Sequence, residues 1–310
     1  MTTMMFYSDM DRAGWWQQMF AEAMPELDFR VWPDIGDRAE IDYALVWKPE
    51  PGLLASLPNL RAILSLGAGV DHIFADDRLP AGVPVSRVVN DNMTQRMREW
   101  VLLQVLAHHR RVREYQGMQR ARVWRDLPQP HAGERRVGVM GLGELGGDSA
   151  AHLSAIGFDV AGWSRSPKSV PGVTCYSGTE GWESFLARTE ILVCLLPLTP
   201  ETEGIINADL LGCLPAGASV INAGRGRHVV EEDLLAALDS GQISEATLDV
   251  FRTEPLPVTH PLWTHPRVTV YPHVAAFTDP RATVDQVVAN IRRVEAGEPP
   301  LNTVDPAKGY

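Results

Sequence analysis

Cysteine is scarce in this sequence, and long apolar segments are absent. The 310 residues include only three cysteines, Cys175, Cys194 and Cys213, whose wide spacing fits neither a disulfide framework nor a C-x-x-C metal or redox motif. The longest uncharged run is the 15 residues of 210–224, whereas a transmembrane helix needs about 20 apolar residues. The first nine residues contain no basic segment ahead of an apolar one, so no secretory signal is expected. These absences predict a cytoplasmic protein without a membrane partner.

Positive charge is also in deficit, because 28 Lys and Arg oppose 39 Asp and Glu for a net charge of −11. The exception is 94–125, where eight arginines and two glutamates give a local charge of +6, so that the remainder carries −17. An acidic remainder argues against a nucleic-acid partner, and the simplest interpretation of this segment is a helix with solvated arginines. His108 and His109 in the same segment lack Cys or acidic residues at ligand spacing, so no metal site is predicted.

A glycine-rich loop follows an apolar run at 136–140. Gly141, Gly143 and Gly146 form the pattern G-x-G-x-x-G, and a helical pattern comes after them. In this context the first glycine permits a tight turn, the second lets a pyrophosphate approach the backbone, and the third allows close packing of helix on strand. The N-terminus of the helix would supply N–H donors to the anion. The sequence therefore predicts a dinucleotide-binding loop, and the alternative is a turn with incidental glycines.

Short apolar runs alternate with amphipathic stretches in two series, which indicates two parallel α/β sheets. The first series predicts strands over 4–7, 29–32, 43–47, 61–66 and 83–89. The second predicts strands over 136–140, 159–163, 191–196, 219–222, 246–251 and 268–271. One helix from Met93 to about Gln119 should join the two series. We predict two doubly wound domains, a Rossmann cofactor domain (93–280) inserted in a flavodoxin-like substrate domain (1–92 and 281–310).

The strand predicted at 159–163 ends in a cationic segment rather than an acidic one. An NAD site carries Asp or Glu at this place to bind the ribose hydroxyls, whereas this chain has Ser164, Arg165, Ser166 and Lys168. Hydroxyl and cationic groups suit a 2′-phosphate. We therefore predict NADPH (NADP⁺) as the cofactor, with NADH less preferred. The alternative is that Arg165 and Lys168 are ordinary solvated charges.

Arg225, Glu254 and His273 each come at or shortly after the end of a strand of the second series. Because ligands of open parallel sheets bind beyond the carboxyl ends of the strands, these side chains should face the same crevice as the glycine loop. Arg225 can bind a carboxylate and polarise a carbonyl oxygen, His273 can donate a proton to a developing alkoxide, and Glu254 can hold the imidazole. Each residue has a structural explanation by itself, but together they predict the reduction of a 2-keto acid.

These motifs resemble the D-isomer-specific 2-hydroxyacid dehydrogenase family over nearly the whole chain. Five segments carry the resemblance: 141–146 (GLGELG), 195–202 (LLPLTPET), 222–226 (NAGRG), 248–254 (LDVFRTE) and 272–273 (PH). Segments 233–241, 261–266 and 272–276 and the terminal Gly309-Tyr310 are similar to the subgroup that reduces glyoxylate and hydroxypyruvate with a preference for NADPH. Ser164 and Arg165, in place of the usual acidic residue, also match that subgroup.

The resemblance implies roles for individual residues. It assigns Arg225 to substrate binding, His273 to acid/base catalysis and Glu254 to the support of His273. It also implies that the region 93–125 forms the interface of a homodimer. The residues that it places along the cofactor are Gly141, Gly143, Glu144, Leu145, Gly146, Leu196, Pro197, Ala223 and Asp249, the last facing the nicotinamide carboxamide.

The first series offers a candidate substrate site. Gly67, Ala68 and Gly69 follow one of its strands, and the backbone N–H groups of such a turn can bind a carboxylate. In the family the matching turn binds the acid group of the substrate, and the alternative here is a tight turn without a ligand. Trp47 ends another strand, where it could limit the pocket to a small substrate, although packing alone explains it equally well.

We therefore expect an enzyme, an NADP-dependent D-2-hydroxyacid dehydrogenase. Its expected reactions are the reduction of glyoxylate to glycolate and of hydroxypyruvate to D-glycerate. The nearest alternative is a reductase of the same fold that acts on a different 2-keto acid. A non-catalytic dinucleotide sensor is a further alternative, because one fold hosts many functions, but such a sensor has no need of Arg225, Glu254 and His273 together.

Overall fold

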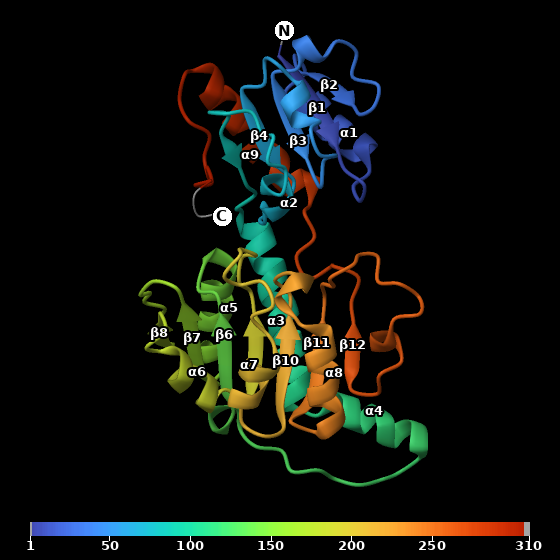
Figure 1. The fold of residues 1–310 in the computed structure, drawn as a ribbon, viewed down its shortest axis with the longest axis vertical. Helices are drawn as coiled ribbons and strands as arrows, with labels where there is room; N and C mark the ends of the chain where they lie inside the picture. Colours follow the sequence, from blue (N-terminus) through green and yellow to red (C-terminus); the bar gives the residue numbers. More distant parts are fainter. Residues whose placement is uncertain (1, 307–310) are drawn as a thin grey trace. The chain divides into compact units, whose positions relative to one another are not determined.

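The computed structural model describes residues 2–306, which form two compact units (Figure 1). Unit 1 comprises the residues up to Met93 and those from Thr278 onward, and unit 2 comprises Thr94–Phe277. Two residues that contribute to the resemblance, Gly309 and Tyr310, lie outside the described residues. The end of the predicted segment 281–310 lies outside them as well. Within the described range, no helix combines the length and the apolar composition needed to cross a membrane.

Unit 1 is built on a five-stranded parallel sheet in the order β2-β1-β3-β4-β5, which is the flavodoxin-like order. Its strands are β1 (Thr3–Tyr7), β2 (Asp28–Val31), β3 (Tyr43–Val46), β4 (Ala62–Ser65) and β5 (Val85–Ser86), and its helices are α1 (Ala13–Ala23), α2 (Asp71–Phe74) and α9 (Pro280–Glu295). β3 and β4 are buried along their whole length, as expected of central strands covered on both faces. Trp16 and Phe20 of α1 and Val287 of α9 pack together on one face.

Unit 2 contains a seven-stranded sheet in the order β12-β11-β10-β9-β6-β7-β8, and its strands pair in parallel. Its strands are β6 (Arg136–Met140), β7 (Asp159–Ser164), β8 (Thr174–Ser177), β9 (Ile191–Cys194), β10 (Ala218–Asn222), β11 (Ile243–Leu248) and β12 (Val268–Val270). The strand order reverses between β6 and β9, and ligands of a Rossmann sheet bind at that switch point.

Helices cover both faces of the unit 2 sheet (Figure 1). The covering helices are α3 (Asp91–His109, whose first residues belong to unit 1), α5 (Glu144–Ala155), α6 (Trp182–Arg188), α7 (Ala208–Cys213) and α8 (Glu231–Ser240). A further helix, α4 (Val112–Ala121), extends beyond the sheet (Figure 1). Val101 and Val105 of α3 and Leu153 of α5 join the core of one face, while Leu211 of α7 and Leu234 of α8 join that of the other. The predicted fold class, two doubly wound α/β domains with a Rossmann domain inserted in the chain of the other, is confirmed.

The single helix predicted over 93–119 is wrong, because two helices occupy this region. α3 ends at His109, and Arg111 takes the left-handed conformation (φ 58°) before α4 begins. The interruption turns the second half of the predicted apolar face away from the core. Val112 and Tyr115, which one continuous helix would carry on the same face as the buried Val105, are exposed.

Two predicted strands have clearly different bounds in the structure, and one further strand is not predicted by the sequence pattern. The strand predicted over 83–89 is reduced to the two residues of β5. The strand predicted over 246–251 starts earlier, at Ile243, and ends at Leu248, so that Asp249 already belongs to the following loop. β8 was not predicted, because its sequence Thr-Cys-Tyr-Ser has little apolar character; it is an edge strand paired only with β7.

Candidate active site

The glycine-rich loop connects β6 to α5 through very close backbone contacts. Gly141 has φ +98°, and a side-chain carbon there would lie 2.6 Å from the Leu195 carbonyl oxygen. A side-chain carbon at Gly146 would lie 1.8 Å from the Gly141 carbonyl oxygen, so that only glycine allows α5 to pack so closely. At Gly143 such a carbon would meet nothing within 4 Å. Packing therefore requires Gly141 and Gly146, whereas Gly143 borders open space.

The first turn of α5 has hydrogen-bond donors to offer. Within residues 2–306, the backbone N–H groups of Glu144, Leu145 and Gly146 donate no hydrogen bond, as expected at the start of a helix whose N-cap residue, Gly143, has no side chain. These groups and the helix dipole favour an anion. A cavity of about 400 Å³ borders the turn, with Gly143, Glu144 and Lys168 in its lining. The donors and the space fit the pyrophosphate of a dinucleotide.

The turn after β7 is cationic, as the sequence indicated. The Ser164 hydroxyl is buried and donates a hydrogen bond to the Ser166 carbonyl oxygen (2.8 Å), which shapes the turn. Arg165, Ser166 and Lys168 are exposed. Because Lys168 lines the cavity at the first turn of α5, the cationic turn and the glycine-rich loop border the same space.

Leu196, Pro197 and Ala223 lie beside the glycine-rich loop. Leu196 and Pro197 follow β9, which pairs with β6, and Ala223 follows β10, which pairs with β9. The Ala223 N–H donates to the Cys194 carbonyl oxygen (3.2 Å), and the Pro197 carbonyl oxygen accepts from the Thr202 hydroxyl (2.7 Å). The carboxyl ends of the three central strands thus bring these residues to one edge of the sheet.

Arg225 stands on a loop that Asn222, the last residue of β10, holds in place. The Asn222 amide nitrogen donates to the Arg225 carbonyl oxygen (2.9 Å), and its amide oxygen accepts from the Gly224 N–H (3.1 Å). One guanidinium nitrogen of Arg225 donates to the Gly224 carbonyl oxygen (2.9 Å). A side-chain carbon at Gly226 would lie 1.8 Å from the Phe251 carbonyl carbon, so the loop packs directly on the chain that follows β11.

His273 and Glu254 form the pair that the sequence predicted. Nδ1 of His273 lies 3.0 Å from Oε2 of Glu254, and both side chains are about one-fifth exposed, at 23% and 20%. The other carboxylate oxygen of Glu254 accepts from the Phe251 N–H (3.0 Å). The carboxylate is therefore fixed by the backbone and fixes the imidazole in turn, which leaves Nε2 as the ring nitrogen directed away from Glu254.

Asp249 holds the loop that carries His273. It is 1% exposed, and its two carboxylate oxygens accept from the N–H groups of Val274 (2.8 Å) and Ala275 (2.9 Å). Its carbonyl oxygen accepts from the His273 N–H (2.8 Å). Burial raises the pKa of Asp249, and these two hydrogen bonds oppose the shift. His273 itself has φ 56°, a strained conformation for a residue with a side chain, which these contacts hold in place.

In unit 1, Trp47 and the turn of Gly67, Ala68 and Gly69 lie together. A side-chain carbon at Gly67 would lie 2.6 Å from the Trp47 ring, so only glycine lets the indole rest on the turn. The ring also lies against His72 of α2, at 4.3 Å between ring centroids. Within the described part of the chain, the backbone N–H groups of Ala68 and Gly69 donate no hydrogen bond. They are donors for a carboxylate, as the sequence predicted for this turn.

Among residues 2–306, no group of three or more His, Cys, Asp or Glu is arranged to hold a metal ion. The two ring nitrogens of His108 are hydrogen-bonded to the hydroxyls of Ser219 and Thr247, each at 2.8 Å. The His109 ring packs edge-on against Phe158. Both histidines therefore serve the packing of α3 on the sheet.

Sequence reasoning missed Asn222 and His228, and it missed the backbone contacts of Asp249, which it placed at the cofactor. Asn222, His228 and Asp249 make hydrogen bonds to the backbone of the loops that carry Arg225 and His273. Asn222 and Asp249 lie inside recognised motifs, so the sequence indicates that they are close to the site. Their partners are backbone groups, however, and no pattern of side chains indicates such contacts.

Known proteins share both the sequence and the fold of this chain. The family profile "D-isomer specific 2-hydroxyacid dehydrogenase, NAD binding domain" matches residues 102–275. A protein named glyoxylate/hydroxypyruvate reductase A from Serratia proteamaculans (strain 568) is 46% identical over 310 residues, which cover 98% of this chain and 99% of that protein.

Several solved structures match over the whole chain, including the following two, which contain bound NADPH or NADP. A D-isomer specific 2-hydroxyacid dehydrogenase from Xanthobacter autotrophicus Py2, in complex with NADPH and MES, has a TM-score of 0.95 and 49% identity and covers 100% of this chain and 99% of its own. An NADPH-dependent glyoxylate/hydroxypyruvate reductase from Sinorhizobium meliloti, in complex with NADP and sulfate, has a TM-score of 0.93 and 42% identity, with 100% of both chains covered. The chain thus belongs to the D-isomer specific 2-hydroxyacid dehydrogenase family, which confirms the resemblance.

Proposed function

We propose that this protein is an NADPH-dependent reductase of small 2-keto acids that converts glyoxylate to glycolate and hydroxypyruvate to D-glycerate. The observation that carries the proposal is the Glu254–His273 pair, at 3.0 Å, on the same sheet edge as Arg225 and a loop that fits a dinucleotide. The names of the relatives from Serratia and Sinorhizobium support the substrates, and the NADPH and NADP bound in the two solved structures support the cofactor.

Unit 2 provides the cofactor site in this proposal. The pyrophosphate is held by the Gly141–Gly146 loop and by the N–H groups of Glu144 and Leu145. The 2′-phosphate is held by the turn 164–168, where Arg165 attracts it and an acidic residue would repel it. NADH lacks this phosphate and therefore binds less well. Further cofactor contacts come from Leu196, Pro197, Ala223 and Asp249. When bound, NADPH supplies the hydride that reduces C2 of the keto acid.

The chain's own side chains orient the keto acid and supply the proton. The Arg225 guanidinium binds the carboxylate and polarises the carbonyl oxygen, which stabilises the negative charge that develops there. His273 donates a proton from Nε2 to that oxygen, and Glu254 stabilises the imidazolium form before the transfer and keeps the ring oriented. The hydrogen bonds of Arg225 and His273 to the carbonyl oxygen strengthen as negative charge develops there.

The substrate's acid group also needs donors, and unit 1 offers them. The N–H groups of Ala68 and Gly69, with Gly67 at the start of the turn, bind the carboxylate. The Trp47 indole, fixed against Gly67, limits the length of the substrate. We accordingly assign the segments 1–92 and 281–310 to substrate binding and 93–280 to cofactor binding.

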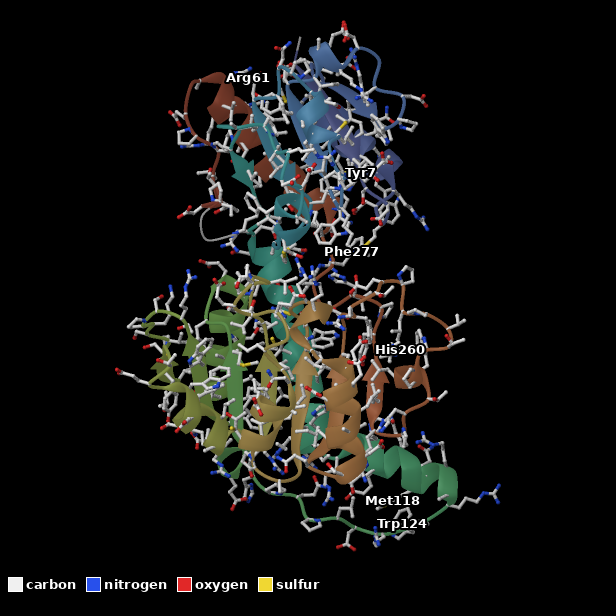
Figure 2. The ribbon with its side chains drawn as sticks, in the orientation of Figure 1. Tyr7, Arg61, Met118, Trp124, His260 and Phe277 are labelled. Carbon is white, nitrogen blue, oxygen red and sulfur yellow. The ribbon has the colours of Figure 1, made fainter. Side chains whose placement is uncertain are left out.

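We further propose a cytoplasmic homodimer that associates through the region 93–125. Six large apolar or aromatic residues of this region are exposed, namely Leu103, Leu106, Val112, Tyr115, Val123 and Trp124. α4 and the segment after it extend beyond the sheet of unit 2, and Trp124 lies on that segment (Figure 2). In this proposal a second copy of the chain covers these side chains. The three free cysteines are consistent with a reducing compartment.

The test is NADPH oxidation measured with glyoxylate, hydroxypyruvate and a series of 2-keto acids of increasing size. We expect turnover with the two small acids, a steep loss of kcat/KM with longer ones, and a lower kcat/KM with NADH. Turnover of only bulky keto acids would transfer the proposal to another substrate. NADPH binding without turnover of any keto acid would contradict an enzymatic function and favour a dinucleotide sensor.

A further inference from the structure

A buried histidine that the proposed chemistry does not use lies between the Arg225 loop and the segment after β9. His228 ends the short turn 226–228 and is 0% exposed. Its Nδ1 accepts a hydrogen bond from the Arg225 backbone N–H (3.0 Å), and its Nε2 lies 3.2 Å from the Pro197 carbonyl oxygen. Because a neutral imidazole carries one proton, which must then be on Nε2, the ring donates to Pro197 and accepts from Arg225.

The surroundings of His228 fix the ring in this orientation. Cys194 lies with Sγ 3.7 Å from Nδ1, and burial raises the pKa of its thiol to about 12, so the sulfur carries a proton and acts as a second donor to Nδ1. A side-chain carbon at Gly224 would lie 2.9 Å from the same nitrogen. The ring therefore has donors around Nδ1 and an acceptor at Nε2.

We propose that His228 is a positioning residue that sets the backbone of the Arg225 loop and the Leu196–Pro197 segment relative to each other. Through its two ring nitrogens it connects the residue that binds the keto acid to the segment that borders the cofactor. This inference rests on the proposed function, which gives those two loops their roles. A small displacement of a group that orients a substrate can cost about 100-fold in rate. A shift of the His228 ring would therefore affect both the binding of the keto acid at Arg225 and the binding of the cofactor along Leu196–Pro197.

The two contacts can be separated by substitution. In His228→Asn the amide oxygen occupies the place of Nδ1 and still accepts from Arg225, but nothing reaches Pro197. In His228→Gln the longer side chain places an N–H donor near the site of Nε2 and gives up the acceptor for Arg225. His228→Ala removes both contacts. Each lost hydrogen bond to a buried group is worth about tenfold.

The measurements are the dissociation constant of NADPH, by fluorescence titration without substrate, and KM and kcat for glyoxylate at saturating NADPH. We expect His228→Asn to weaken NADPH binding about tenfold with little change in KM, and His228→Gln to raise KM about tenfold with little change in NADPH binding. His228→Ala should show both effects. If His228→Ala does not fold, the Asn and Gln variants carry the comparison.

The matched control is His108→Gln, which replaces another buried histidine of unit 2 with hydrogen bonds on both ring nitrogens. It should lower the unfolding midpoint and leave KM and the NADPH dissociation constant unchanged. The inference is overturned if the His228 variants behave like this control, or if His228→Asn and His228→Gln change the two constants in the same way. Absence of turnover in the wild type would contradict the proposed function alone, because NADPH affinity still reports on the contact with Pro197.

Discussion

Lowering the pH from 7 to 5 should destabilise unit 2 by about 2 kcal/mol through the titration of His108. The imidazole is buried between α3 and the sheet, where the hydroxyls of Ser219 and Thr247 engage both ring nitrogens. Burial, with a smaller contribution from the charge of Arg113, lowers the pKa of His108 from 6.5 to about 3. The folded protein therefore keeps this ring neutral at every pH at which it is ordinarily handled.

The sign and size of the effect follow from proton linkage. Between pH 7 and 5 the unfolded chain protonates a histidine with a pKa of 6.5, whereas folded His108, with a pKa of about 3, stays neutral. The unfolded state thus binds more protons, and stability falls as the pH falls through 6.5 and onward to about 3. The loss is about 1.4 kcal/mol for each pH unit below 6.5, which gives about 2 kcal/mol at pH 5.

The assay is urea unfolding followed by far-UV circular dichroism at pH 7, 6 and 5, for the wild type and for His108→Gln. The variant has no titrating group at this place, so its loss of stability between pH 7 and 5 should be smaller by about 2 kcal/mol. His109, whose pKa burial also lowers, is present in both proteins and cancels. Equal losses in the two proteins would refute a neutral, buried His108.

Three further substitutions test the site. Gly146→Ala should destabilise unit 2 by about 2–3 kcal/mol because the new carbon would lie 1.8 Å from a carbonyl oxygen. In Gly143→Ala the new carbon meets nothing within 4 Å, so this variant should keep the urea midpoint and bind NADPH more weakly. Equal effects of the two substitutions on stability and on NADPH binding would contradict the assignment of Gly146 to packing and Gly143 to the cofactor. Arg165→Asp should lower the preference for NADPH over NADH by at least about tenfold in kcat/KM, while the same charge change in Arg120→Asp, on exposed α4, should not. His273→Gln should lower kcat about 100- to 10,000-fold with an unchanged NADPH dissociation constant, and near-normal kcat would remove His273 from proton transfer.

The sheet order and its switch point were predictable because apolar strands and glycine spacing are local signals. β6, β9 and β10 are almost continuous apolar runs, and such runs alternating with helices permit few topologies. The break between α3 and α4 has no comparable signal. The chain turns at Arg111 in the left-handed conformation, and neither Gly nor Pro marks the place, so periodicity alone extended one helix through it.

The site likewise contains residues that a local signal indicates and residues that no local signal indicates. Arg225, Glu254 and His273 could be predicted because their side chains have the chemistry that the reaction needs and because parallel topology brings strand ends to one edge. The residues behind them depend on loop conformations that the sequence does not specify.

Asp249 illustrates this dependence. The resemblance directs it toward the nicotinamide, yet in the structure both of its carboxylate oxygens hold the N–H groups after His273. Those contacts stabilise His273 at φ 56°, a conformation that costs a residue with a side chain about 1 kcal/mol or more. Glu254 orients the His273 ring, but the backbone that carries the ring is held by a buried carboxylate 24 residues earlier in the chain, at a distance in sequence that no local motif spans.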